Sequence, residues 1–130
     1  MATNFEELLG MNLVEASGDR VVITCKVRPE LHQPYGILHG GVYCSLVESA
    51  ASIAGALWLG EDGNVVGVAN TTNFIRATRE GNLTTTATPL QRGRTQQLWQ
   101  VEVKDDEDRL VAQGQVRLAN LRNADNLGRS

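Results

Sequence analysis

Only two cysteines and two histidines occur among the 130 residues of the chain. This scarcity argues against a disulfide framework and leaves no Cys/His cluster with the spacing of a zinc site. We therefore expect no bound metal, and we expect Cys25 and Cys44 to be reduced thiols, as in a cytoplasmic protein. His32 has no motif around it and is expected at the surface. The net charge is −3 and no basic face is apparent, which argues against a nucleic-acid partner.

Several common catalytic and nucleotide-binding motifs are also missing. The chain has no G-x-G-x-x-G pattern, no Walker A pattern and no G-x-S-x-G nucleophile elbow. Its first residues, MATNFEELLGMNLVEA, lack the basic region and apolar core of a signal peptide. The apolar stretch Val42–Leu59 approaches the length of a membrane span, but a central carboxylate is costly in a bilayer. We expect a buried helix there and no membrane partner.

The composition, 42% hydrophobic and 21% charged, fits a single globular domain over residues 1–130. The hydrophobic pattern predicts a short helix at residues 4–9, a long helix at 41–58, and a polar, frayed tail from about residue 121. Strands are predicted at residues 11–16, 20–27, 65–74, 81–90, 95–104 and 109–118. One long helix followed by meandering antiparallel strands indicates an α+β fold whose sheet wraps the helix. The free edges of such a sheet are commonly paired in oligomers.

Within the stretch Val42–Leu59, Glu48 is the only group besides the Cys44 thiol that ionises near neutral pH. A charge on an otherwise core-facing helix is unfavourable unless it is paired, hydrogen-bonded or protonated. Gly40 and Gly41 precede this stretch and leave free N–H groups at the helix start, which can bind an anion or polarise a carbonyl oxygen. Taken alone, the glycines also fit a tight turn into close packing, and the carboxylate also fits a paired structural role.

Three polar residues flank these groups: Gln33, His39 and Ser52. Each also has a simpler explanation: Gln33 as a solvated loop amide, His39 as a ring bonded to the backbone, and Ser52 as a small packing residue. Together with the N–H donors and the carboxylate, however, they form the set that acyl transfer requires. A Cys44 nucleophile paired with His39 is less favoured, because a thiol in the middle of an apolar helix is usually inert. A serine triad has little support with so few histidines.

The run HQPYGILHGGVYCSLVESAAS, residues 32–52, resembles the hotdog-fold acyl-CoA thioesterases of the phenylacetate-degradation type. Related members of that group act on 4-hydroxybenzoyl-CoA and 1,4-dihydroxy-2-naphthoyl-CoA. The segments VVGVANTTNFIRATREG (65–81) and GRTQQLWQ (93–100) are also similar to this family. The resemblance covers nearly the whole chain, and the spacing of LHGG to ES is its most specific part. It implies a hotdog fold, in which a curved antiparallel sheet wraps a long central helix.

The resemblance also implies a homodimer, further paired into a homotetramer, with each active site between two subunits. Glu48 would be the catalytic carboxylate, acting as nucleophile or general base, and the Gly40 N–H would polarise the thioester carbonyl. Gln33 and His39 would orient the thioester and face Glu48 of the partner subunit. Ser52 would assist the attacking water.

The remaining implications concern the substrate. Contacts with the CoA phosphates and pantetheine would come from Arg76, Gly93, Arg94 and Thr95, and since CoA is part of the substrate no separate cofactor is expected. The acyl pocket would be formed by residues such as Tyr35, Val42, Tyr43 and Phe74. We therefore expect a cytoplasmic thioesterase that hydrolyses an acyl-CoA to the free acid and CoA, with an aromatic or bulky acyl group favoured over a medium-chain aliphatic one. The alternative is a non-catalytic acyl-CoA-binding protein of the same fold; a hydratase is disfavoured because its Asp/His pair is not found.

Overall fold

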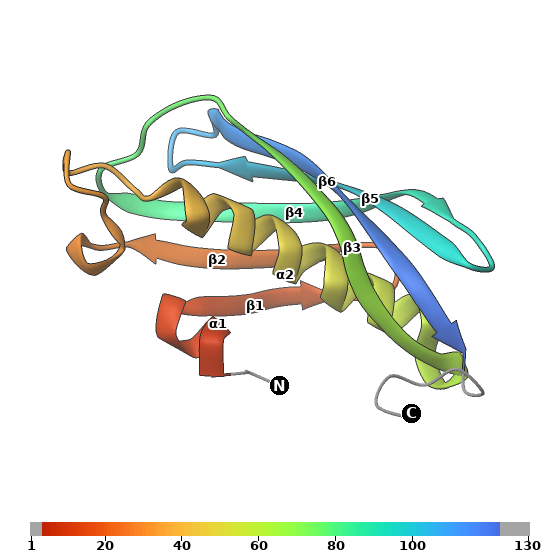
Figure 1. Cartoon of the computed structure of the whole chain (residues 1–130). Helices are drawn as coiled ribbons and strands as arrows, with labels where there is room; N and C mark the ends of the chain where they lie inside the picture. Colours follow the sequence, from red (N-terminus) through yellow and green to blue (C-terminus); the bar gives the residue numbers. More distant parts are fainter. Residues whose placement is uncertain (1–3, 123–130) are drawn as a thin grey trace.

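A long helix lies across a curved antiparallel sheet in the computed structural model, which describes residues 4–122 (Figure 1). The helices are α1 (Asn4–Leu9) and α2 (Gly40–Leu59), with 3-10 turns at Pro29–Leu31 and Gly60–Asp62. The strands are β1 (Met11–Ala16), β2 (Val21–Val27), β3 (Gly63–Phe74), β4 (Gly81–Arg92), β5 (Gln96–Lys104) and β6 (Leu110–Arg122). They form one six-stranded sheet in the order β1-β2-β4-β5-β6-β3. This arrangement confirms the expected hotdog fold.

The core forms where the sheet curves around α2. Along β5, buried and partly exposed residues alternate, so that Gln97, Trp99, Val101 and Val103 all point inward. The helix meets them with a buried face that includes Leu46, Val47, Ala50, Ala51 and Ala54. Small residues allow the close approach: a Cβ at Gly55 would collide with Leu118 of β6.

Two features of the C-terminal half go beyond what the sequence predicts. Strands β4, β5 and β6 form an antiparallel meander, whereas β3 pairs with β6 at the far edge of the sheet and not with β4. Strand β6 continues to Arg122, beyond its predicted end at residue 118, and pairs there with Gly63. Asn120, two residues before the end of β6, is buried, and its side chain donates a hydrogen bond to the carbonyl oxygen of Gly93. The rest of the predicted tail lies outside the described residues.

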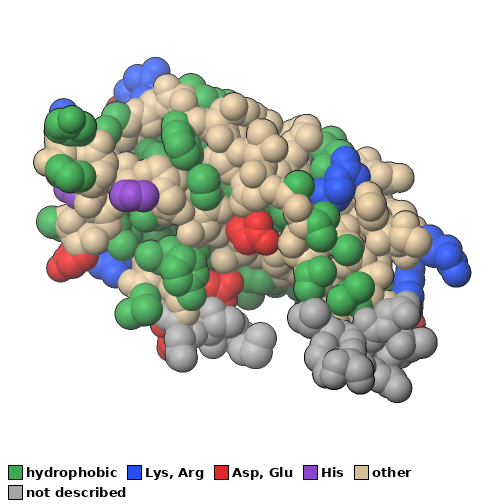
Figure 2. Space-filling model, viewed as in Figure 1, with side chains coloured by type: hydrophobic (Ala, Val, Ile, Leu, Met, Phe, Trp, Pro, Cys, Tyr) green, Lys and Arg blue, Asp and Glu red, His purple; other side chains and the backbone are tan. Residues whose placement is uncertain are grey.

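Strands β1 and β3 form the two edges of the sheet. β3 is 12 residues long, pairs only with β6, and has mostly exposed side chains. The surface over α2 and β3 carries few charged side chains (Figure 2). A long and largely uncharged edge of this kind is suited to pairing with another chain.

Residues 40–62, which include α2, form a helical stretch that is long and apolar enough to cross a membrane by length and composition alone. More than half of the apolar window is buried inside the fold. A core helix passes the same criterion, and α2 has the burial expected of one.

Candidate active site

The N-terminus of α2 is built by His39, Gly40 and Gly41. His39 is the N-cap, and its Nδ1 accepts a hydrogen bond from the N–H of Gly41 at 2.7 Å. Because Nδ1 accepts this bond, the proton of the neutral ring is on Nε2, which is free to face a ligand. A Cβ at Gly40 would come within 2.9 Å of the Phe74 ring. The two glycines therefore serve close packing as well as access to the first N–H groups of the helix.

A cavity of about 310 Å³ opens beside this helix start. It is lined by Gln33, Ile37, Leu38, Gly40, Tyr43, Phe74, Ile75, Arg76 and Ala77. The rings of Tyr43 and Phe74 lie with centroids 5.8 Å apart, so one wall is aromatic. Two of the residues expected to form the acyl pocket thus line this space.

Tyr43 also ties the cavity to the segment that follows β3. Its hydroxyl lies 2.9 Å from Oγ1 of Thr78, and the carbonyl oxygen of Thr78 accepts a bond from the N–H of Leu38 at 2.8 Å. Burial raises the pKa of the Tyr43 hydroxyl above its ordinary value, which keeps it protonated and able to donate. His32, expected at the surface, is half-buried, and its Nε2 lies 2.8 Å from the carbonyl oxygen of Arg79.

Gln33 lies in the loop that precedes α2, where it starts a tight turn. The N–H of Gly36 donates to the carbonyl oxygen of Gln33 at 3.0 Å, and the N–H of Tyr35 donates to its side-chain Oε1. Since Oε1 is occupied in this way, the amide group is left to donate through Nε2. Gln33 and Gly40 line the same cavity, so the structure brings these two predicted site residues together.

Glu48 is half-buried and lies beside the edge strand β3, not in the core. Its Oε1 accepts a hydrogen bond from Nδ2 of Asn70 at 3.1 Å, and its Oε2 accepts a longer one from Oγ of Ser52 at 3.4 Å. A Cβ at Gly67 would collide with Oε2, so this glycine provides the space for the carboxylate. The carboxylate is therefore hydrogen-bonded, which is one of the conditions expected for a charge on this otherwise core-facing helix.

Within one chain, the helix start and the carboxylate are separate. Gly40 and Glu48 are eight positions apart on α2, which corresponds to about 12 Å along the helix axis. A carbonyl donor and a nucleophile or base must both lie within about 3 Å of the reacting group. The two groups are therefore not adjacent within one chain.

The predicted CoA contacts are also divided. Arg76 lines the cavity at the helix start, whereas Gly93–Thr95 form the turn between β4 and β5. That turn lies at the opposite end of the sheet from the loop that carries Gln33 (Figure 1). It is held by Asn120, whose Nδ2 donates to the carbonyl oxygens of Gly93 and Arg94 at 3.0 and 3.2 Å.

A buried chain of hydrogen bonds connects this turn to α2. Nε2 of Gln97 donates to Oδ1 of Asn120 at 2.8 Å and to the carbonyl oxygen of Gly55 at 3.2 Å. The Trp99 indole N–H donates to Oε1 of Gln97 at 2.7 Å. Every polar atom of the Gln97 amide head is thus used, which explains how this side chain is fully buried.

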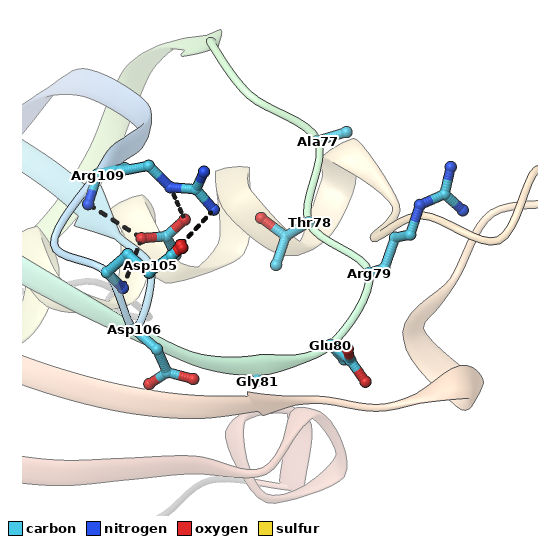
Figure 3. Close-up of a pocket in the computed structure, with 9 residues that line it drawn as sticks. Ala77, Thr78, Arg79, Glu80, Gly81, Asp105, Asp106 and Arg109 are labelled. Atoms are coloured by element: carbon cyan, nitrogen blue, oxygen red, sulfur yellow. Dashed lines mark hydrogen bonds and ion pairs between the residues drawn. The ribbon is translucent and has the colours of Figure 1, made fainter.

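A larger cavity, of about 580 Å³, lies between residues 77–81 and the turn joining β5 to β6 (Figure 3). Two of its acidic groups are already hydrogen-bonded: Asp105 accepts from Arg109, and Asp106 accepts from the N–H of Asn82 at 2.9 Å. Among residues 4–122, no group of three or more His, Cys, Asp or Glu side chains is arranged to hold a metal ion. Both cysteines are free. We therefore place the candidate site at the N-terminus of α2 and at Glu48.

Asn70, which donates a hydrogen bond to Glu48, is the site residue that the sequence did not predict. Asparagine is depleted in strands, so its position inside the β-branched run of β3 is the signal that marks it. The structure gives it a partner on α2, which no local pattern reveals.

The fold and the carboxylate-bearing helix define the class of hotdog-fold thioester hydrolases. The family model of the Thioesterase superfamily matches residues 35–112. The chain belongs to this superfamily, which confirms the resemblance inferred from the sequence.

Relatives support the same class. A Mycobacterium tuberculosis protein with a provisional esterase name is 51% identical over 120 residues, covering 90% of this chain and 86% of the relative. The 1,4-dihydroxy-2-naphthoyl-CoA hydrolase of Escherichia coli is 33% identical over 118 residues, covering 91% and 87%. The crystal structure of AziG from S. sahachiroi superposes with a TM-score of 0.92 at 51% identity, covering 94% and 99%.

Proposed function

We propose that this thioester hydrolase cleaves an acyl-CoA to the free acid and CoA at a site shared by two subunits. Glu48 of one subunit acts on the acyl carbon, and the Gly40 N–H of the other polarises the thioester carbonyl. One observation carries this proposal. The accessible N-terminus of α2 and the Glu48 carboxylate, which is held beside the free edge of the sheet, are separated along the helix. A second copy paired along β3 supplies the missing half of each site.

The other predicted residues take supporting roles in this proposal. Gln33 donates through Nε2 to orient the thioester, and His39 faces it through Nε2 of its ring. The hydroxyl of Ser52, bonded to Glu48, assists the attacking water. Arg76 and the turn Gly93–Thr95 contact the phosphates and pantetheine of CoA. These groups lie far apart within one chain, as expected if the CoA site spans two subunits.

We infer an aromatic or bulky acyl group. The cavity beside Gly40 has an aromatic wall and is largely apolar, which favours a flat ring. The E. coli relative is named for its action on an aromatic CoA thioester. We further propose a homotetramer of two dimers, as the resemblance implies, and a cytoplasmic location, which the two unpaired cysteines favour.

Two routes are open to the carboxylate. In direct attack, an oxygen of Glu48 bonds to the acyl carbon, the C–S bond breaks, CoA leaves as its thiolate, and water then hydrolyses the resulting anhydride. In general-base catalysis, Glu48 takes a proton from water as the water oxygen bonds to the acyl carbon, and the C–S bond then breaks. Single turnover in heavy-oxygen water distinguishes them when water attacks the Glu48 carboxyl carbon of the anhydride, because the label then enters Glu48, whereas general-base catalysis places it in the product acid.

The test uses benzoyl-CoA and related thioesters with the wild type, Glu48→Gln and Glu48→Ala. We expect both substitutions to lower kcat by about 100- to 10,000-fold, the range for a positioned acid–base group. Gln33→Ala and His39→Ala should lower it less, since they remove only orientation. Comparable turnover by the wild type and Glu48→Gln would contradict the catalytic role. Tight binding of acyl-CoA with no turnover of any acyl thioester would instead favour the non-catalytic alternative.

A further inference from the structure

Asn70 connects the edge strand β3 to the candidate catalytic carboxylate. Its Nδ2 donates to Oε1 of Glu48 at 3.1 Å and to the carbonyl oxygen of Cys44, one turn earlier on α2, also at 3.1 Å. We propose that Asn70 is a positioning residue, which fixes the direction of the Glu48 carboxylate toward the thioester. This inference rests on the proposed function, in which Glu48 is the reacting group.

The orientation of the Asn70 amide follows from its partners. The carbonyl oxygen of Cys44 can only accept a hydrogen bond, so the amino group of Asn70 must face the helix. On its other side, Oδ1 of Asn70 accepts a bond from the hydroxyl of Thr72 at 2.7 Å. The reversed amide would place its oxygen against two acceptors. The Cys44 carbonyl therefore selects the orientation that serves Glu48, and the Thr72 hydroxyl bonds to the amide held in that orientation.

The two carboxylate oxygens of Glu48 are held unequally. Oε1 accepts the bond from Asn70, whereas Oε2 has a single long bond from Ser52 at 3.4 Å and lies over Gly67. A glycine there keeps the space beside Oε2 free of side-chain atoms. Oε1 is thus the anchored oxygen, and Oε2 is the one left to meet the acyl carbon or a water.

The contact between Asn70 and Glu48 restrains a side chain that is otherwise flexible. Glu48 is on a rigid helix but has a flexible side chain, and ordering it before the reaction reduces the entropy lost at the reacting geometry. A displacement of about 1 Å at a reacting group can cost on the order of 100-fold in rate. A substitution at Asn70 is accordingly expected to act on kcat, while KM stays unchanged because the contacts to CoA remain.

The experiment compares Asn70→Leu, Thr72→Val and Thr72→Ser with the wild type on benzoyl-CoA. We expect Asn70→Leu to lower kcat about 10- to 100-fold with little change in KM. Thr72→Val keeps the shape and removes the hydroxyl, so it should lower kcat by a smaller factor, and Thr72→Ser should restore it. Asn73→Leu is the matched control, because this asparagine lies on the same strand but donates to Gln113 at 3.2 Å. It should leave kcat unchanged.

The same substitution in the Glu48→Gln background tests the coupling. If Asn70 acts through Glu48, Asn70→Leu should cause no further loss of the residual rate there. If Asn70→Leu lowers kcat by the same factor in the wild-type and Glu48→Gln backgrounds, this inference is overturned. It is also overturned if Asn70→Leu leaves kcat unchanged while Glu48→Gln is inactive. Either outcome leaves the proposed function intact. Full turnover by Glu48→Gln overturns the proposed function itself. If Asn70→Leu does not fold, Thr72→Val and Thr72→Ser decide the question, since both are conservative.

Discussion

Gly40, Gly41 and Gly67 each lie where another side chain approaches the backbone closely. A Cβ would meet the Phe74 ring at Gly40, Nδ1 of His39 at Gly41 and the Glu48 carboxylate at Gly67. None of the three has a positive φ. A larger residue at any of these positions would therefore collide with a neighbouring side chain. All three positions lie next to the groups proposed to react.

Thr85 offers a prediction about stability at the residue scale. Its side chain is fully buried in β4, and within residues 4–122 its hydroxyl has no hydrogen-bond partner. A buried hydroxyl without a partner loses its bonds to water and gains none in return. We expect Thr85→Val, which replaces the hydroxyl by a methyl group of similar size, to raise the free energy of unfolding by about 1 kcal/mol.

Chemical denaturation of the purified protein measures this change. Thr84→Val is the matched control, because Thr84 is exposed on the same strand and its hydroxyl keeps water as a partner. That variant should show little change in stability. A destabilised Thr85→Val would mean that the hydroxyl makes a bond that the folded chain requires.

Single residues were predictable where their chemistry is unusual for their position. Glu48 is the one carboxylate in an apolar helix, and Gly40 lies at the predicted start of that helix, where N–H groups are free. Both could therefore be recognised within one short segment. Asn70 depends on β3 lying beside α2, a contact between residues 22 positions apart. A pattern within one segment cannot contain that information.

At the scale of elements, the turn between β5 and β6 makes stability depend on pH. Asp105 accepts bonds from the N–H groups of Arg109 and Glu107 and from Nε of Arg109. The backbone bond from Arg109 is the main cause that holds the pKa of Asp105 below its ordinary value. A carboxyl whose pKa is lower in the folded state stabilises the fold while it is ionised.

We expect Asp105→Asn to be less stable than the wild type at pH 7. Since the unfolded pKa of an aspartate is about 3.9, the difference should be complete above that pH and should shrink as the pH falls through the lower folded value. Thermal unfolding at a series of pH values from neutral to acidic measures it. A stability difference that is constant over this range would show that the charge of Asp105 has no part in closing the turn.

The bounds of most elements could be predicted because they follow local periodicity. Strand β5 alternates along its length, and α2 lies between glycines at both ends. The end of β6 was missed because Asn120 and Arg122 are polar, and their place in the strand depends on bonds to the distant turn at residues 93–95. The order of the strands was missed for a similar reason, since the pairing of β3 with β6 joins segments far apart in the sequence.

At the scale of the whole molecule, the two unpaired edges of the sheet differ. β1 has six residues, whereas β3 has 12 and carries the residue that holds Glu48. Pairing two copies of β3 about a two-fold axis would place the same patch of each subunit against the other. An interface of this kind would bring Gly40 of one chain toward Glu48 of the other, as the proposed shared site requires.

Mixing two variants with defects in different halves of the site tests whether the sites are shared. Glu48→Gln and Gln33→Ala subunits, unfolded and refolded together in equal amounts, should form about half mixed dimers if pairing is random. In each mixed dimer one site combines an intact Glu48 with an intact Gln33, and the other site carries both substitutions. About one quarter of all sites are then intact, so we expect the activity of the mixture to exceed the average of the two variants refolded alone. If each site were built within one chain, no dimer would contain an intact site, and the mixture would show only the average of the two variants.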